Sequence, residues 1–435
     1  MVGQAPIVSM QAEASRTGAV QDSAPMPSST PSRDQELSTL AVAAALALAA
    51  AVSLGLARFS YALLLPPMRA DLGWSYTTAG AMNTVNAAGY LVGALLAPGW
   101  LRRYGARNAL LAGGYGAALL LAAHGAVTSD AALYLLRALT GVASAATFVA
   151  GGLLAARLSS RARLPQAAGG AAPRAPSAGL VLGIYYGGTG VGIIVSALVV
   201  PPLSATPGAH AWQWAWVALG AAALLATAIT GRATRGLDPT AAATSTPAPF
   251  VWRHFACGLA SYFMFGLGYI GYMTFVVTLL REQQLGTTAI TLFYALLGFA
   301  VLGSSFVWAG LLQRERGGGA LRLLNALLAV ATVLPVLSAH PVAVFASGLL
   351  FGGVFLSVVA STTALVRHNL PAAAWPAGIA AFTTLFAAGQ IVGPTLVGWI
   401  ADGAGGLRGG LTVSAGVLLL GALIAWGQRP TGERC

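Results

Sequence analysis

From Leu37 almost to its end, the chain alternates between long apolar stretches and short polar breaks. Each stretch has about 20 apolar residues, the length of helix that crosses roughly 30 Å of hydrocarbon. The stretches are continuously apolar, whereas barrel strands would carry polar residues at alternate positions, so the pattern predicts membrane-spanning helices. The expected helices lie near residues 38–65, 77–101, 108–126, 131–156, 178–200, 211–231, 254–280, 286–312, 321–338, 341–366, 375–401 and 408–427.

The breaks divide these twelve helices into two groups of six. Residues 232–252 are rich in Thr, Pro and Ala and are expected to form a linker. Residues 1–36 are rich in Ser, Pro, Ala and Gln, which is typical of a disordered tail, and residues 429–435 form a second, short tail. The predicted fold is an all-α integral membrane protein with six-helix bundles at 37–231 and 253–428.

The two groups of helices resemble each other weakly. Gly99–Gly105 and Gly310–Gly317, which follow the second and eighth helices, both combine glycine, leucine and two arginines. Gly187–Gly192 and Gly389–Gly398 make the fifth and eleventh helices glycine-rich. Features that recur six helices apart indicate a duplicated unit, which places a binding site between the halves near the midplane. Glycine-rich faces are equally compatible with ordinary close packing of helices.

Composition agrees with a membrane protein. The chain is 57% hydrophobic and 8% charged, with a mean hydropathy of +0.75, whereas soluble domains are about a quarter charged. The net charge of +12 could indicate a nucleic-acid partner, but every basic residue is Arg and most lie in the breaks. A membrane-surface role fits this placement better, and no nucleic-acid partner is expected.

The distribution of arginines predicts the orientation. Of 23 basic residues, three lie in one set of loops (Arg69, Arg281 and Arg408), two lie within predicted helices, and the other 18 fall on the opposite side. Because positive loops stay inside, both tails and the linker are expected in the cytoplasm. The expected location is a bacterial cytoplasmic (inner) membrane, with the chain crossing it many times.

Arg58 and Arg137 lie inside predicted helices. A central Arg costs about 2.5 to 3.5 kcal/mol on insertion scales, so its side chain should face the protein interior or a cavity. Guanidinium groups pair well with carboxylates and phosphates, which predicts an organic anion as cargo. The alternatives are partial snorkelling for Arg58 and structural hydrogen bonds to backbone carbonyls for Arg137.

Polar residues near these arginines complete a candidate binding site. Asn83, Asn86 and Tyr90 share one helical face at spacings i, i+3 and i+7. The alternative for the asparagines is bonding between helices, and for the tyrosines packing or a place at the interface. The predicted substrate-binding residues are Arg58, Tyr61, Asn83, Asn86, Tyr90, Arg137, Tyr185, Tyr186, Tyr269 and Gln390.

The sequence contains no other chemistry typical of a catalytic centre. All eleven Asp and Glu residues fall in tails, loops or helix ends of the predicted map, which weakens an acidic proton relay within the membrane. The sequence has neither a phosphate-binding glycine loop nor a metal-spaced group of His and Cys. We therefore expect no catalytic residue, no metal, no cofactor and no enzymatic activity.

Several motifs can be compared with known families: GLARFSY at Gly55–Tyr61, GWLRRYGAR at Gly99–Arg107, Arg137 with Gly141, and GIYYGGTGVG at Gly183–Gly192. Together they resemble the major facilitator superfamily, in its YbfB/YjiJ-type bacterial branch. The second motif is similar to the superfamily's loop between helices two and three, although Arg102 stands where Asp is usual.

The resemblance implies two six-helix bundles that rock around a central cavity. It also implies that glycines and loop-motif residues matter for the conformational change. The residues expected in this role are Gly99, Arg103, Gly105, Arg107, Gly187, Gly190, Gly393 and Pro394.

The function expected from these observations is secondary active transport of a small organic solute, with an organic anion favoured, by alternating access. The alternatives are an exporter of amphipathic drugs and a membrane sensor that binds its ligand without moving it. The expected partners are a small-molecule cargo and the lipid bilayer, and the oligomeric state is left open with a monomer favoured.

Overall fold

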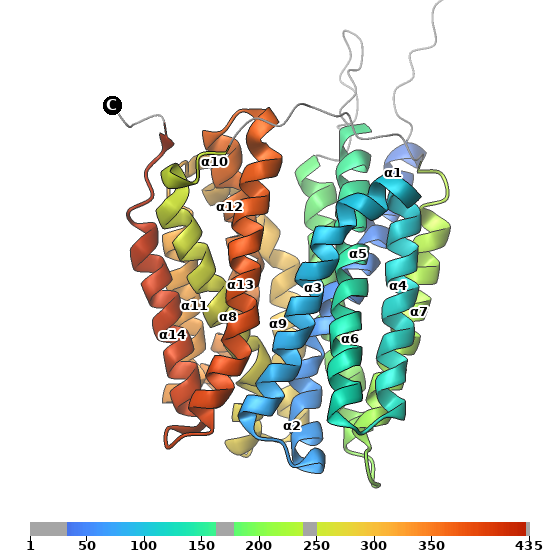
Figure 1. The fold of residues 1–435 in the computed structure, drawn as a ribbon, viewed down its shortest axis with the longest axis vertical. Coiled ribbons are helices and arrows are strands. Elements are labelled where there is room, and N and C mark those ends of the chain that lie inside the picture. The colour runs from blue at the N-terminus through green and yellow to red at the C-terminus, as the bar shows by residue number, and fades with distance from the viewer. Residues whose placement is uncertain (1–32, 162–177, 238–249, 432–435) are drawn as a thin grey trace, which may run out of the picture.

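A computed structural model describes residues 33–161, 178–237 and 250–431. The described residues form helices and their connections, arranged as two groups of six membrane-length helices side by side (Figure 1). The first group, here called the N-half, contains α1 Arg33–Ala50, η1 Ala51–Phe59, α2 Tyr61–Leu72, α3 Tyr76–Tyr104, α4 Ala106–Ala123, η2 His124–Ala126, α5 Asp130–Arg161, α6 Ala178–Ser204 and α7 Trp212–Ala233.

The second group, the C-half, lies beside the first (Figure 1). It contains η3 Trp252–Phe255, α8 Ala256–Glu282, α9 Thr287–Val307, α10 Ala309–Arg314, α11 Gly319–Leu337, α12 Pro341–Asn369, η4 Ala372–Ala374, α13 Trp375–Ala401 and α14 Gly406–Ala425.

The twelve predicted spans are confirmed, and their ends agree with the prediction within a few residues except in the first span. That span continues through Pro66 and Pro67 to Leu72, so the expectation that Arg69 lies in a loop was wrong. Proline removes a backbone N–H and its ring crowds the carbonyl four residues before it, and a membrane helix tolerates both where neighbouring groups satisfy the freed backbone groups. The predicted tail at 1–36 and the linker at 232–252 lie largely outside the described residues, so the domain limits stay predictions.

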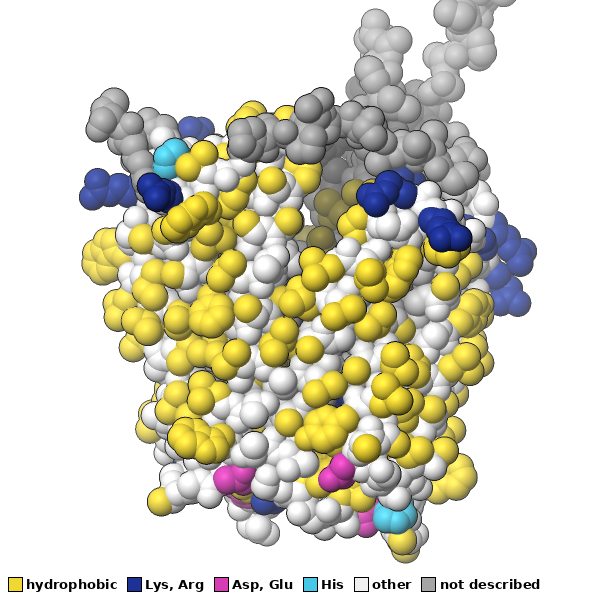
Figure 2. Space-filling model, viewed as in Figure 1, with side chains coloured by type: hydrophobic (Ala, Val, Ile, Leu, Met, Phe, Trp, Pro, Cys, Tyr) yellow, Lys and Arg dark blue, Asp and Glu magenta, His cyan; other side chains and the backbone are white. Residues whose placement is uncertain are grey.

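The two ends of the molecule differ in charge (Figure 2). Arginines gather at the end where α3 finishes and α4 begins, here called the arginine-rich end. Asp71, Asp130, Glu282 and Asp402 lie at the opposite end, here called the acidic end. Charges therefore border the apolar band on both sides, as the sequence pattern predicts.

The two halves contact each other most closely toward the acidic end. In α3 against α13, a Cβ atom at Gly80 would clash with the backbone of Pro394, and one at Gly398 would clash with the backbone of Tyr76. Thr84 Oγ1 donates a 2.7 Å hydrogen bond to the Ile391 carbonyl. Glycine at these positions lets the backbones of the two halves touch.

The helices α6 and α9 separate toward the arginine-rich end. A Cβ atom at Gly190 would clash with the carbonyl of Gly298, whereas one at Gly183 would lie 3.6 Å from Ser305 Cβ, in ordinary contact. The surface is hollowed between the halves at this end (Figure 2). The structure is therefore closed at the acidic end where α3 meets α13, and more open at the arginine-rich end. Elsewhere at the acidic end, a cavity of about 260 Å³ lies between the halves, lined by Pro66, Pro201, Val277 and Ile290.

Asp402 closes the acidic end by bonding to the opposite half. Its carboxylate accepts hydrogen bonds from Tyr76 N at 2.8 Å, Thr77 N at 2.9 Å and Thr77 Oγ1 at 2.6 Å, at the start of α3. A carboxylate there satisfies free N–H groups and complements the helix dipole. Desolvation acts to raise the pKa of Asp402, but the hydrogen bonds from Thr77 and Tyr76 outweigh it and lower the pKa.

We expect Asp402→Asn to open the acidic end at neutral pH. Because the pKa of Asp402 is lowered when the end is closed, its charge stabilises closure above the ordinary pKa of about 3.9 and loses this effect as the pH falls through the lowered pKa. Spin labels at Ala205→Cys and Ala404→Cys, with Cys257 and Cys435 replaced by Ser, would measure the distance by double electron–electron resonance. The variant should populate longer distances at pH 7.

Asp130→Asn is the matched control, because Asp130 accepts from Trp74 Nε1 at 2.8 Å within the N-half. It should leave the distances unchanged. Equal distances in Asp402→Asn and the parent would show that this carboxylate does not hold the end closed.

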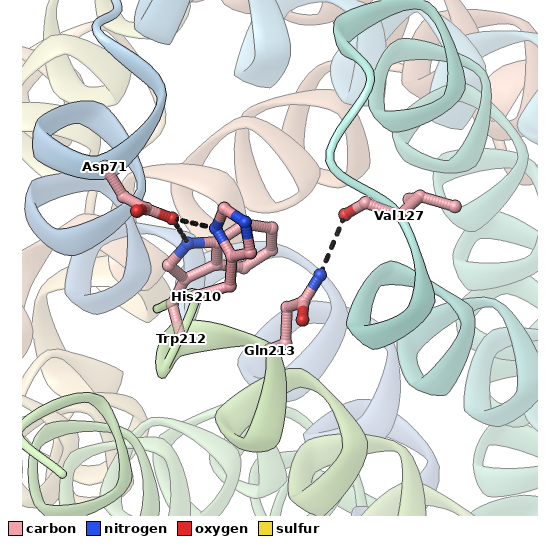
Figure 3. Close-up of polar contacts among 5 residues, drawn as sticks. All are labelled: Asp71, Val127, His210, Trp212 and Gln213. Atoms are coloured by element: carbon pink, nitrogen blue, oxygen red, sulfur yellow. Dashed lines mark hydrogen bonds and ion pairs between the residues drawn. The ribbon is translucent and has the colours of Figure 1, made fainter. Parts of the chain in front are cut away.

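Asp71, by contrast, is bound entirely within the N-half (Figure 3). Its Oδ2 atom lies 2.5 Å from His210 Nδ1 and accepts from Trp212 Nε1 at 2.6 Å. Gln213 Nε2 donates to the Val127 carbonyl at 3.3 Å. These contacts fasten the α6–α7 connection to α2 and to the segment before α5, so they stiffen one half and do not join the two.

Candidate functional site

Arg58 lies in η1, a π-helix within the first span. A π-helix has a wider turn than an α-helix and is rare, and short π segments occur often at functional sites. Ser60 N bonds to Gly55 O, and Ser60 Oγ donates to Leu56 O at 2.6 Å, which satisfies carbonyls that the wider turn leaves free. Glycine at Gly55 and Gly192 allows η1 and α6 to touch at this level.

The Arg58 side chain reaches from the N-half to the C-half. Its Nη2 atom donates a 2.8 Å hydrogen bond to Gln390 Oε1 on α13, and its guanidinium lies 5.5 Å from the Tyr90 ring centre. Gln390 in turn bonds to the Tyr269 hydroxyl on α8. Arg58 is 3% exposed, and its Nε atom has no hydrogen-bond partner among the described residues.

Three tyrosines surround this arginine from both halves. The phenol groups of Tyr90, Tyr186 and Tyr269 lie near enough to one another or to Arg58 to interact electrostatically. Tyr186 on α6 is 39% exposed and Tyr90 is partly exposed, while Tyr269 is buried. Arg58, Tyr90, Tyr186, Tyr269 and Gln390 are here called the central layer, and their role in binding cargo stays a prediction.

The central layer lies near the middle of α13, away from both ends of the molecule. Gln390 lies eleven residues from Ala401, about 16 Å along α13 from the acidic end. Thr84 and Asn83 bond to the C-half nearer that end, Asn83 through a 2.7 Å bond to Thr274 Oγ1. The central layer therefore lies where the closed region ends and the more open region begins.

Arg137 forms a separate network within the N-half. Its Nη1 donates to the Ala57 carbonyl at 3.1 Å, Nη2 to Asn83 Oδ1 at 3.1 Å, and Nε to the Met82 carbonyl at 3.4 Å. Its guanidinium lies 4.6 Å from the Tyr61 ring centre. All three guanidinium nitrogens of Arg137 thus donate hydrogen bonds inside the N-half. This arrangement matches the structural role that the sequence analysis gave as the alternative to cargo binding.

Three other predicted binding residues also have structural partners. Tyr61 donates to the Ala79 carbonyl at 2.8 Å, and Asn86 donates to the Arg137 carbonyl at 3.0 Å. Tyr185 donates to the Phe148 carbonyl at 2.6 Å and is fully buried. Tyr61 and Asn86 both contact Arg137, whereas Tyr185 lies in the packing of α6 on α5.

The residues predicted to serve the conformational change fall into two groups. Gly190 and Pro394 lie at backbone contacts between the halves, and Gly187 faces Leu302 of the C-half. Gly393 packs against Leu267 inside the C-half. The loop-motif residues lie at the arginine-rich end: Gly99 in open space, Arg103 against the Tyr104 ring, Gly105 at a left-handed turn with φ +78°, and Arg107 bonded to the Gly231 carbonyl.

The carboxylates whose side chains the structure describes lie at helix ends, and none of them forms an ion pair with Arg58 or Arg137. They are Asp71, Asp130, Glu282, Glu315 and Asp402. Within the same described residues, no three His, Cys, Asp or Glu side chains gather as a metal site would require. The positive charge of the central layer is therefore without an acidic partner among these residues.

The family model described as "Uncharacterised MFS-type transporter YbfB" matches residues 50–426. The chain belongs to this family. Its members are transporters rather than enzymes, so the chain is a multi-pass membrane transporter of the major facilitator fold. No curated protein sequence matches the chain significantly.

Solved structures agree with this family in fold. The nucleoside transporter NupG has a TM-score of 0.66 at 13% identity, with 89% of this chain and 98% of that chain covered. A bacterial homologue of the human lysosomal transporter Spinster, in an inward-facing and unoccupied conformation, has a TM-score of 0.65 at 15% identity, with 89% and 96% covered. At such identities the likeness shows the shared fold.

Within this MFS-type fold, some contacts at the site had no signal in the sequence. Thr274 bonds to Asn83, and Tyr294 on α9 donates to the Phe59 carbonyl at 2.6 Å. A lone Thr or Tyr inside an apolar span is common, so neither stands out without the fold. Their common feature is their position on α8 and α9, two of the C-half helices that meet the N-half.

Proposed function

We propose that this transporter moves a small organic anion by alternating access, and that Arg58 binds the anionic group. The observation that supports the proposal is a buried guanidinium without a carboxylate partner at the boundary between the two halves. Burying an uncompensated cation is costly, so a cation kept in such a place favours a role in binding an anion.

Gln390 occupies the hydrogen-bonding position on Arg58 that an anionic cargo would take. Its amide oxygen accepts one hydrogen bond from Arg58, whereas a carboxylate would accept two parallel, charge-assisted bonds that are roughly twice as strong as neutral ones. An arriving anion would therefore displace Gln390 from Arg58 and change the contact between η1 and α13. Cargo binding and the contact between the halves are linked through this one guanidinium.

The proposed orientation places the arginine-rich end in the cytoplasm of a bacterial cell, with both termini on that side. The excess of arginines at this end supports it. In this orientation the structure is open inward and closed outward, and Asp402 holds the outer closure. Transport would require the outer contacts of Gly80, Thr84 and Gly398 to separate while the inner ends approach.

Counterflow in liposomes tests the proposal. Purified protein is reconstituted into vesicles preloaded with an unlabelled compound, and entry of the same labelled compound is followed for organic carboxylates, organic phosphates and amphipathic cations. We expect at least one class of organic anion to accumulate transiently. Amphipathic cations should give the same signal as vesicles without protein. Protein-free vesicles provide the control.

The other two functions predict different results. Flux of amphipathic cations alone would show a drug exporter and overturn the anion proposal. Binding of an anion, measured as thermal stabilisation, with no counterflow would show a sensor. Arg58 disfavours the drug exporter, because its guanidinium would repel a cationic cargo at the central layer.

A further inference from the structure

Next to the central layer, the C-half carries a stack of nearly parallel aromatic rings. Phe386 on α13 is its centre, with ring centroids 4.9 Å from Tyr262, 5.3 Å from Phe265 and 5.6 Å from Tyr269, at interplanar angles of 18°, 10° and 17°. Phe355 continues the stack beyond Tyr269 at 6.0 Å. We define these five rings as the aromatic stack.

The aromatic stack lies directly beside the arginine. Phe386 is four residues before Gln390, so both side chains lie on one face of α13, one turn apart. Because α13 runs from the arginine-rich end toward the acidic end, Phe386 is on the open side of Gln390. Phe386 is half-buried, while Phe265 and Phe355 are almost fully buried. A cargo held by Arg58 and extending toward the opening would therefore lie against Phe386.

The opposite wall is aromatic as well. Tyr90, whose ring centre lies 5.5 Å from the Arg58 guanidinium, and Tyr186 belong to the N-half and lie near Tyr262 of the C-half. The polar groups that bond one another at this level include the Arg58 guanidinium, the Gln390 amide and the Tyr269 hydroxyl, among aromatic rings. Rings on both walls provide flat, apolar contact for a planar body, while a flexible aliphatic chain would gain only apolar burial from them.

We propose that the preferred cargo is a small aromatic monocarboxylate, with its carboxylate on Arg58 and its ring against Phe386. The inference rests on the proposed anion transport and narrows its cargo. The ring lies between the aromatic stack and the tyrosines of the N-half, and the carboxylate replaces Gln390 on the guanidinium. The central layer contains one guanidinium, that of Arg58, and one guanidinium pairs with one carboxylate. The sequence contains no lysine, so no lysine ammonium group is present to bind a second carboxylate.

Binding of matched compounds to the purified full-length protein tests this inference. The pairs are benzoate with cyclohexanecarboxylate, and phenylacetate with cyclohexylacetate, which differ in the ring and share the charge. Benzamide shares the ring and lacks the charge. We expect each aromatic acid to bind about threefold to tenfold more tightly than its saturated partner, and benzamide to bind more weakly than benzoate.

Variants of Phe386 decide whether the stack is responsible. Phe386→Leu should remove the difference within each pair, while Phe386→Tyr, which keeps the ring, should retain it and shows that position 386 tolerates substitution. Phe306→Leu is the matched control, because Phe306 is 57% exposed on α9 outside the stack. It should leave the preference unchanged.

The outcomes separate this inference from the anion proposal. Equal binding of aromatic and saturated acids, both lost in Arg58→Gln, would overturn the aromatic preference and leave anion transport standing. A preference that survives Phe386→Leu would place the ring elsewhere and also overturn the inference. Binding of benzamide equal to benzoate, unaffected by Arg58→Gln, would overturn both.

Discussion

Arg58→Gln should lower the efficiency of anion transport about 100-fold. A hydrogen bond to a charged group contributes about 1.5 to 3 kcal/mol, and a carboxylate on the guanidinium loses two such bonds in the variant. Each 1.4 kcal/mol corresponds to a factor of ten, so a net loss of about 3 kcal/mol gives the expected factor. The initial rate of counterflow at low cargo concentration measures the change.

Glutamine is the informative substitution because its amide can still bond to Gln390, so the contact between the halves is preserved. Arg408→Gln is the matched control, since Arg408 is exposed at the acidic end. The transport efficiency of Arg58→Lys should lie between those of Arg58→Gln and Arg408→Gln, because an ammonium keeps the charge and loses the planar pair of donors. Anion transport by Arg58→Gln within about twofold of the parent would remove Arg58 from the cargo site.

A disulfide between Thr84→Cys and Thr395→Cys should abolish transport and be reversed by reduction. The two hydroxyl oxygens lie 2.8 Å apart, on α3 and α13, so cysteines at these positions are close enough to bond without large movement of the backbone. The bond would hold the acidic end closed, and alternating access requires this end to open. Counterflow before and after reduction is measured in a chain with Cys257 and Cys435 replaced by Ser.

The control disulfide joins two residues of one half. Ser53 Oγ and Ser144 Oγ lie 3.0 Å apart, both in the N-half, and both side chains are buried. Ser53→Cys with Ser144→Cys should form a similar bond and leave transport largely intact, because the proposed alternating access moves the N-half as one body. Full transport by the oxidised Thr84–Thr395 pair would show that cargo crosses without separation of α3 from α13.

The sequence predicted the helices well because each membrane span must satisfy its own backbone and bury apolar surface, and both requirements are local. It failed at the first span, where Pro66 and Pro67 suggested an end and the helix continues to Leu72. The π-helix at Ala51–Phe59 had no signal, since its wider turn depends on the contact of Gly55 with Gly192 on α6. Such a contact joins residues far apart in the chain.

The site was predictable only in part. A charged residue in an apolar span is visible in the sequence, so Arg58 and Arg137 both stood out. Their hydrogen-bond partners in the structure distinguish the two arginines. Arg137 bonds to Ala57, Met82 and Asn83 of its own half, whereas Arg58 bonds to Gln390 of the other half. Pairing between halves cannot be read from periodicity along one helix. Phe386 lies one turn from Gln390 on α13, but its ring contacts with Tyr262, Phe265 and Tyr269 of α8 depend on the fold, so nothing in the sequence marked it out.

The uncompensated charge of Arg58 has an electrical consequence. When a monoanion binds, the charge of the central layer falls by one, so the empty carrier and the loaded carrier differ in how strongly the membrane potential acts on them. A full elementary charge moved across 100 mV corresponds to about 2.3 kcal/mol, and a guanidinium in a rocking bundle crosses some fraction of that field. With the cell interior negative, the voltage acts on the return of the empty carrier and favours the conformation that exposes Arg58 to the interior.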